Sequence, residues 1–329
     1  MAGFWVRTAG YDRKAPTKCI LAKTAFRMDN DWVRMKLWGV RGSTPTPQME
    51  NLKFGGNTSC LEIRAGENDP VIFDAGSGIR AVGQMLLEEA AGRPIDATIF
   101  LTHFHWDHIQ GIPFFSPLYG PANRVSFVSG STGRPLRETL EGQMTMPYFP
   151  IGFSQVAAQR EFHQISKGQA MEVNGMTVRP FPLNHPQGAS GYRIESNGIV
   201  IVYATDYEHG VPEADATLRT YAEGADILIC DAQYTPAEYE THRGWGHSTW
   251  QNAVIVAREA GAKHLMLFHH DPEHDDTAMM QIAQNARMQF ENTTAAWEGY
   301  VALLQDSSCD LPEADLVAPE RGIRVTGSR

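Results

Sequence analysis

Short apolar runs bounded by glycine, proline or aspartate recur along the chain from Met35 onward. They are rich in valine, isoleucine, leucine and phenylalanine, a composition typical of β-strands. Several runs are apolar at successive positions, which indicates sheets that are covered by helices. The predicted strands are residues 35–40, 60–65, 70–76, 97–103, 124–130, 176–183, 191–196, 199–206, 226–232 and 264–270.

Helical periodicity is found in fewer segments. The predicted helices are residues 79–92, 248–261 and 276–290. The second of these opens with a capping box formed by Ser248 and Gln251 and ends at Gly261. Strands interspersed with helices predict an α/β fold, with two mixed β-sheets and the helices outside them.

One domain, residues 35–304, is expected to hold all of these elements. Residues 1–34 carry seven basic side chains against three acidic ones, without the apolar core of a secretory signal. We interpret them as a basic tail or as the result of a start assigned too early, with Met28 or Met35 as the alternative start. Residues 305–329 lack periodicity and are interpreted as a C-terminal tail.

Net charge, apolar runs and cysteine spacing indicate which partners and which compartment suit the protein. The formal net charge of −10 disfavours a polyanionic RNA partner. No run of about 18 apolar residues is present, so no membrane helix is expected. The cysteines form no C-x-x-C pair, which suits reduced thiols in a cytoplasmic protein, and Cys60 and Cys230 are predicted to be buried.

The segment LTHFHWDHIQG, residues 101–111, concentrates chemistry in a few positions. His103 and His105 are two residues apart, so an extended backbone projects both to the same side. Asp107 and His108 need a turn to join them. Three imidazoles and a carboxylate suit a divalent ion, most simply Zn²⁺, although Mn²⁺ or Fe²⁺ also fits. The alternative is a loop that is merely rich in histidine.

The segment THFHWDH resembles the HxHxDH signature of the metallo-β-lactamase superfamily. The resemblance extends over most of residues 35–304. The segments GVRGSTPTP, GGNTSCLEI and VIFDAGSGIR resemble the branch that contains ribonuclease Z and the phosphoribosyl cyclic phosphate phosphodiesterases. The resemblance implies an αββα sandwich, in which two mixed β-sheets are flanked by outer helices.

The resemblance also implies a site for two divalent metal ions. The expected ligands are His103, His105 and His185 for one ion, Asp107, His108 and a final histidine for the other, and Asp206 for both. Asp107 is also expected to contribute to catalysis. His269 and His270 compete for the final position, and strand alternation favours His269. His163, His242, His264 and His274 lack such context and are assigned structural or surface roles.

His247, in the segment GHST, matches a histidine that assists the leaving group in the ribonuclease Z-like branch. Asp231 stands where that branch has a glutamate, and it is expected to orient His247 and stabilise its protonated form. Aspartate shortens the reach by one methylene. The alternative is that His247 only helps to cap the following helix.

These parts predict a hydrolase that cleaves a small phosphodiester, with a cyclic nucleotide or cyclic phosphate favoured, by attack of a metal-bound hydroxide. The segment between Val128 and His185 contains no basic, glycine-rich arm of the kind with which ribonuclease Z grips transfer RNA, and residues 135–155 are instead rich in aromatic residues and methionine. The residues expected to line the substrate pocket are Asn57, Thr58, Gly188 and Tyr192. An acyl hydrolase, a ribonuclease Z-like RNA endonuclease and a non-catalytic binding module stay open as alternatives, and so does a homodimer.

Overall fold

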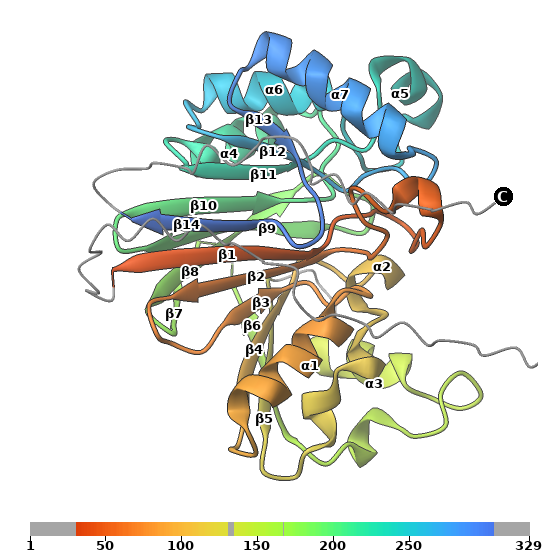
Figure 1. Ribbon diagram of the computed structural model, residues 1–329, viewed down its shortest axis with the longest axis vertical. Helices are drawn as coiled ribbons and strands as arrows, with labels where there is room; N and C mark the ends of the chain where they lie inside the picture. The colour runs from red at the N-terminus through yellow and green to blue at the C-terminus, as the bar shows by residue number, and fades with distance from the viewer. Residues whose placement is uncertain (1–30, 131–134, 167, 306–329) are drawn as a thin grey trace, which may run out of the picture.

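The computed structural model describes residues 31–130, 135–166 and 168–305. Within these ranges two seven-stranded sheets face each other, and helices cover their outer faces (Figure 1). The helices are α1 (Ile79–Ala90), α2 (Trp106–Ile109), α3 (Leu136–Gln143), α4 (Pro212–Ala222), α5 (Pro236–His242), α6 (Trp250–Glu259) and α7 (Asp276–Gln289). This is the predicted αββα sandwich.

The first sheet has the order β14-β1-β2-β3-β4-β5-β6. Its strands are β1 (Trp32–Gly39), β2 (Cys60–Ala65), β3 (Val71–Phe73), β4 (Asp96–Leu101), β5 (Arg124–Gly130), β6 (Gln159–Ile165) and β14 (Val301–Gln305). Strands β3 to β6 run parallel, whereas β14, β1, β2 and β3 pair in antiparallel fashion. The sheet is therefore mixed, as predicted.

The second sheet has the order β13-β12-β11-β10-β9-β8-β7. Its strands are β7 (Met171–Val173), β8 (Met176–Leu183), β9 (Ala189–Ser196), β10 (Ile199–Ala204), β11 (Ile227–Asp231), β12 (Leu265–Phe268) and β13 (Thr293–Ala295). Strands β10 to β13 are parallel, so their carboxyl ends meet at one edge of the sheet. Parallel strands of this kind place side chains from several loops within reach of one another.

Aromatic side chains join the two sheets. Phe73 and Phe100 of the first sheet stack with ring centroids 5.2 Å apart. Tyr192 of β9 lies 5.6 Å from Phe73, and its hydroxyl donates to the Leu101 carbonyl at 2.5 Å. Tyr192 is fully buried in this core. The prediction that it lines a substrate pocket is therefore wrong, because the opposing sheet covers the face of β9 from which Tyr192 projects.

The boundaries of several elements differ from the predicted ones. Strand β1 begins at Trp32, and Val33 pairs with Ala65, so the folded region starts three residues before the expected boundary. Helix α6 begins at Trp250, and its N-cap is Thr249, whose side chain accepts from the Asn252 amide. The prediction that Ser248 caps this helix is wrong. Residues 1–30 and 306–329, which hold most of the two expected tails, lie outside the described residues.

Some elements have no clear signal in the sequence. Helix α4 buries only Leu218 and Ala222, which is too narrow a stripe for its periodicity to stand out. Strand β14 exposes alternate positions and is stabilised by pairing with β1, a strand far away in the sequence. Cys60 and Cys230 are buried free thiols, as predicted, and burial raises the pKa of both. No helix in the described ranges has the length and apolar character needed to cross a membrane.

His264 is expected to make the protein less stable in acid. Burial, and then the charge of Arg287, lower the pKa of His264 to about 4, and its Nε2 lies 3.0 Å from Thr294 Oγ1. Below pH 6.5 the unfolded chain binds a proton here that the folded chain does not bind until about pH 4. The free energy of unfolding therefore falls by about 3 kcal/mol as the pH drops through this window.

Urea unfolding at pH 7.5 and pH 4.5 measures this effect. In His264→Gln the loss of stability between the two pH values should shrink by about 3 kcal/mol. The matched control is His163→Gln, because His163 is exposed. An unchanged pH dependence in His264→Gln would contradict the assignment.

Candidate metal centre

The predicted metal ligands meet at one end of the sandwich, at the end where α2 lies (Figure 1). They stand in loops that follow β4, β8, β10 and β12. Asp206 and His269 follow their strands with φ angles of 59° and 62°, and Asp74, after β3, has a φ of 60°. Left-handed backbone costs a residue with a side chain roughly 1–3 kcal/mol, and such strain is concentrated at functional sites. In this structure Asp206 and His269 lie 3.4 Å apart, Oδ2 to Nε2, and Asp74 contacts His108 of the same cluster.

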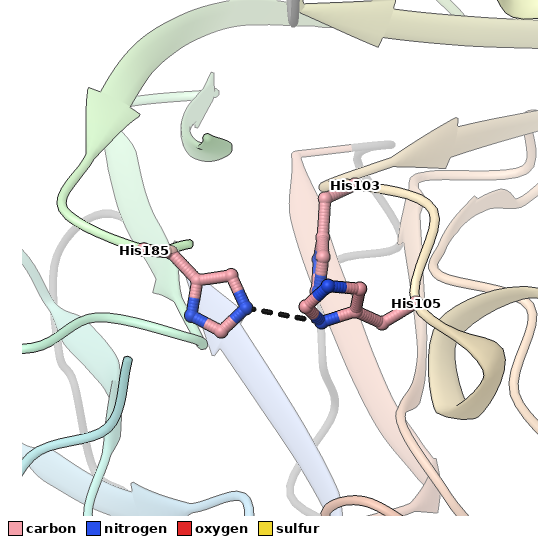
Figure 2. A group of neighbouring side chains, drawn as sticks. All are labelled: His103, His105 and His185. Atoms are coloured by element: carbon pink, nitrogen blue, oxygen red, sulfur yellow. Dashed lines mark hydrogen bonds between the residues drawn. The ribbon is translucent and has the colours of Figure 1, made fainter. Parts of the chain in front are cut away.

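His103, His105 and His185 form the first group. One side-chain nitrogen from each lies within 4.8 Å of the others. The rings reach this point from two separate loops (Figure 2), and His105 Nδ1 lies 3.1 Å from His185 Nε2. His103 is buried, whereas His105 is only half-buried. Solvent therefore reaches the group from the side of His105.

Asp107, His108, Asp206 and His269 form the second group, and all four are buried. Asp107 Oδ2 lies 3.2 Å from His108 Nε2 and 3.1 Å from His269 Nε2. Asp206 stands between the two groups. Its Oδ2 lies 3.0 Å from His108 Nε2, while its Oδ1 lies 3.6 Å from His103 Nε2 and 3.7 Å from His185 Nε2.

The chemistry of these atoms fits divalent cations. The Nε2 atom of His103 is buried and forms no hydrogen bond within the described residues. Buried polar atoms without partners are rare, and a lone pair directed at a cation accounts for this one. Burial holds the pKa of His103 well below its usual range, so its ring keeps the free lone pair that ligation requires. The mixed nitrogen and oxygen set suits Zn²⁺, Mn²⁺ or Fe²⁺.

Charge also favours cations in the second group. Burial alone would raise the pKa of Asp206, but His108 and His269 lower it well below its usual range. Burial would likewise lower the pKa of His269, but Asp206 and Asp107 raise it to about 9. These carboxylates are thus ionised, and without a cation their negative charge is balanced by protons on neighbouring imidazoles. Divalent cations would displace these protons.

Most of the imidazoles are oriented by a partner at Nδ1. His108 Nδ1 lies 2.8 Å from Asp74 Oδ2, and His269 Nδ1 lies 2.9 Å from Gln233 Oε1. His185 Nδ1 lies 2.9 Å from the Gly246 carbonyl. Such partners fix the orientation of a ring and direct its Nε2 toward the ion. Sequence reasoning assigned no site role to these partners. Among these partners, only Asp74 of the segment VIFDAG could have been found from the sequence, because it directly follows a buried strand.

His269, and not His270, faces the cluster. His270 Nε2 lies 2.7 Å from the Ala296 carbonyl, and its ring packs edge-on against Phe54. Successive residues point to opposite sides of an extended chain, so only one of the two can reach the carboxylates. The register argument for His269 therefore agrees with the geometry.

His247 and Asp231 form the predicted pair. His247 Nδ1 lies 2.8 Å from Asp231 Oδ2, so aspartate is long enough to replace the glutamate of related proteins. Asp231 also accepts from the backbone amides of Ser248 and Asp206, at 2.9 and 3.0 Å. The His247 ring stacks on His269 with centroids 4.7 Å apart. Because Thr249 caps α6, the alternative that His247 caps this helix is wrong.

Comparison with known proteins identifies the family. Residues 70–270 match the family described as the beta-lactamase superfamily domain, which is more than half of the chain. The chain belongs to the metallo-β-lactamase superfamily. It is therefore a hydrolase of this superfamily, as the HxHxDH motif predicted, and its histidine and aspartate cluster is able to hold metal ions.

The relatives of this superfamily member include ribonucleases. Ribonuclease BN of Cronobacter sakazakii is 29% identical over 256 residues, which cover 60% of this chain and 77% of that protein. Ribonuclease Z of Haloarcula marismortui is 24% identical over 341 residues, covering 86% and 99%. The metallo-β-lactamase fold protein YhfI from Bacillus subtilis superposes with a TM-score of 0.64 at 18% identity, covering 83% and 100%. The expectation that RNA is an unlikely partner has no support from these relatives.

Two of the predicted substrate residues have structural roles in this superfamily member. Thr58 is fully buried, and its hydroxyl accepts from the Ser77 amide and from Gln110 Nε2. The Asn57 side chain donates to Glu298 and accepts from the Ser77 hydroxyl. The Thr58 side chain is fully buried, so the prediction that it contacts substrate is wrong, whereas contact between the half-buried Asn57 and substrate stays a prediction. Gly188 lies in the turn after His185, and its contact with substrate stays a prediction.

Asp74 is expected to control metal affinity through His108. Its carboxylate is fully buried and also accepts from the Thr102 amide at 2.8 Å and the Tyr203 hydroxyl at 3.0 Å. Asp74→Asn removes the charge that holds His108, and the metal affinity should fall roughly 10- to 100-fold. Competition with a chelator measures this change. The matched control is Asp226→Asn, a buried aspartate outside the cluster, and equal affinity in both variants would contradict the role of Asp74.

Proposed function

We propose that this protein is a dinuclear metal-dependent phosphodiesterase that cleaves a small phosphodiester, with a cyclic nucleotide or cyclic phosphate favoured. The observation that carries the proposal is the contact between His247 and Asp231 beside both groups of metal-ligating side chains. An acyl hydrolase needs no separate acid at this position. A phosphodiester with an alkoxide leaving group does, because the departing oxygen must gain a proton.

Each of the two groups of side chains would hold one metal ion. His103, His105 and His185 would hold one ion, and Asp107, His108 and His269 the other, with Asp206 shared between them. When bound, two divalent cations supply a deprotonated water as nucleophile and neutralise charge on the phosphate. The excess of imidazole ligands favours Zn²⁺ as the native ion, with Mn²⁺ or Fe²⁺ as alternatives.

His247 is the proposed general acid. Its Nδ1 is held by Asp231, so its Nε2 is left to face the substrate. The ring lies 5.3 Å from the His185 ring and 4.7 Å from the His269 ring, centroid to centroid. A phosphate held between the two groups would place its leaving oxygen within reach of His247. Asp231 holds the ring in this orientation through the contact at Nδ1.

RNA is the second candidate substrate, because the matched relatives are named ribonucleases. The net charge of −10 weighs against it, since binding to polyanions depends on clustered lysine and arginine. Binding to RNA would also weaken steeply as salt is added. Affinity for structured RNA at two salt concentrations therefore separates the two candidates.

The test is hydrolysis by protein loaded with Zn²⁺ or Mn²⁺. The substrates are bis(p-nitrophenyl) phosphate, a panel of cyclic nucleotides, a lactone and a precursor transfer RNA. The proposal expects turnover of the small phosphodiesters and none of the lactone. Turnover of the lactone alone would favour an acyl hydrolase, and turnover of the RNA alone would favour an endonuclease. A fully metal-loaded protein that is inert toward all of them would favour a binding module.

A further inference from the structure

Two exposed tryptophans stand next in the chain to residues at the metal-ligand cluster, and neither has a role in the proposed chemistry. Trp245 is 61% exposed and Trp106 is 64% exposed, whereas the other tryptophans in the described ranges are buried or half-buried. Trp106 directly follows His105. Trp245 precedes Gly246, whose carbonyl contacts His185. Because His105 and His185 contact each other, the two tryptophans are each close in the chain to a member of the same group.

The loop that carries Trp245 is held firmly despite its exposure. Glu208 is buried and accepts from the Gly244 amide at 2.6 Å and from the Gly246 amide at 2.8 Å. Gly246 has a φ of 94°, and a Cβ on it would lie 2.3 Å from His185 Nδ1. The backbone thus passes directly over His185, which fixes the position of Trp245 relative to the cluster.

The Trp245 ring is also oriented. It contacts His242 edge-on with ring centroids 4.8 Å apart, and the Trp245 amide donates to the His242 carbonyl at 3.1 Å. His242 in turn stacks on the buried Tyr234 at 4.6 Å. A large indole that is fixed in place and left facing solvent is typical of a binding surface, because little conformational entropy is lost when a ligand covers it.

We propose that Trp245, together with Trp106, stacks against the nucleobase of the substrate, so that the phosphodiester is that of a nucleoside. This inference rests on the proposed function. His247 lies two residues after Trp245, so the indole and the proposed general acid are carried by the same short segment. Flat π-faces are what an indole binds best, and nucleobases are the flat rings that natural phosphodiesters carry.

The first experiment compares two substrates of the metal-loaded protein that differ only in the base. They are a cyclic adenosine phosphate and the same cyclic phosphate of methyl riboside. The wild type should prefer the nucleotide. In Trp245→Ala the ratio of the two kcat/KM values should fall about tenfold, through KM, and Trp245→Phe should restore most of it. Trp106→Ala should give a smaller fall in the same direction.

The second experiment needs no turnover. Binding of adenosine 5′-monophosphate and of ribose 5-phosphate is measured by calorimetry, with metal content checked in each variant. The nucleotide should bind about tenfold more tightly, and Trp245→Ala should abolish this difference. Met288→Ala, which removes an exposed apolar side chain from α7, is the matched control and should behave as wild type.

The outcomes separate the two proposals. Hydrolysis of both phosphodiesters with equal kcat/KM, or equal affinity for the two phosphates, would overturn the nucleobase inference and leave the phosphodiesterase proposal standing. A preference for the nucleotide in binding, without hydrolysis of any phosphodiester, would overturn the proposed function and retain the nucleobase site.

Discussion

Asp206→Asn is expected to remove bound metal and to lower phosphodiester hydrolysis by at least about three powers of ten. Asp206 is the one side chain of the cluster whose two carboxylate oxygens face different groups, Oδ2 toward His108 and Oδ1 toward His103 and His185. Asparagine offers one weak carbonyl ligand and no charge. A loss of several kcal/mol in transition-state stabilisation corresponds to this reduction in rate.

The measurement is metal content by mass spectrometry, together with the rate on bis(p-nitrophenyl) phosphate. Asp226→Asn is the matched control. Asp226 is also a buried aspartate, but it pairs with Lys263 at 2.7 Å and accepts from the Val200 amide, away from the cluster. It should lose stability without losing metal. Full metal content and full activity in Asp206→Asn would show that the ions bind at a site other than this cluster.

His247→Ala is expected to lower the rate on substrates with alkoxide leaving groups by about 10²- to 10⁴-fold, the usual contribution of a general acid. The rate on bis(p-nitrophenyl) phosphate should change far less, because p-nitrophenolate is a weak base and departs without a proton. The metal content should stay unchanged, since His247 Nδ1 is bound to Asp231 and the ring stacks beside the ligands.

Comparing the two leaving groups separates a general acid from a structural histidine. An equal loss on both substrates would mean that His247 supports the site in some other way, for example by packing on His269. His163→Gln, on the exposed part of β6, serves as the control for a histidine replacement.

The predicted strands were found largely because their signal is local. The strand assigned to residues 60–65 coincides with β2, and that assigned to residues 124–130 coincides with β5, since a short run rich in apolar side chains needs no distant partner to be recognised. Strand β14 and helix α4 were missed because each exposes much of its surface. Their stability comes from pairing or packing with elements far away in the sequence, which periodicity does not report.

The two errors among the substrate residues have a common cause. Tyr192 and Thr58 are polar residues close in sequence to the site motifs, and sequence proximity suggested contact with substrate. Each hydroxyl instead hydrogen-bonds to protein atoms in the interior. Whether a polar side chain faces a pocket or the core depends on which element covers it, and that element is not adjacent in the chain.

The sequence by itself determined the metal motif, because His103, His105, Asp107 and His108 lie within six positions and a strand end followed by one helical turn brings them together. It also located Asp206, Asp231 and His247 at strand and helix ends. Only the tertiary structure decided that Asp74 and Gln233 orient the imidazoles, that His269 rather than His270 faces the carboxylates, and that Trp245 is exposed beside the site. Backbone geometry repeats over a few residues and can be deduced locally, whereas burial and hydrogen-bond partners depend on how distant segments pack.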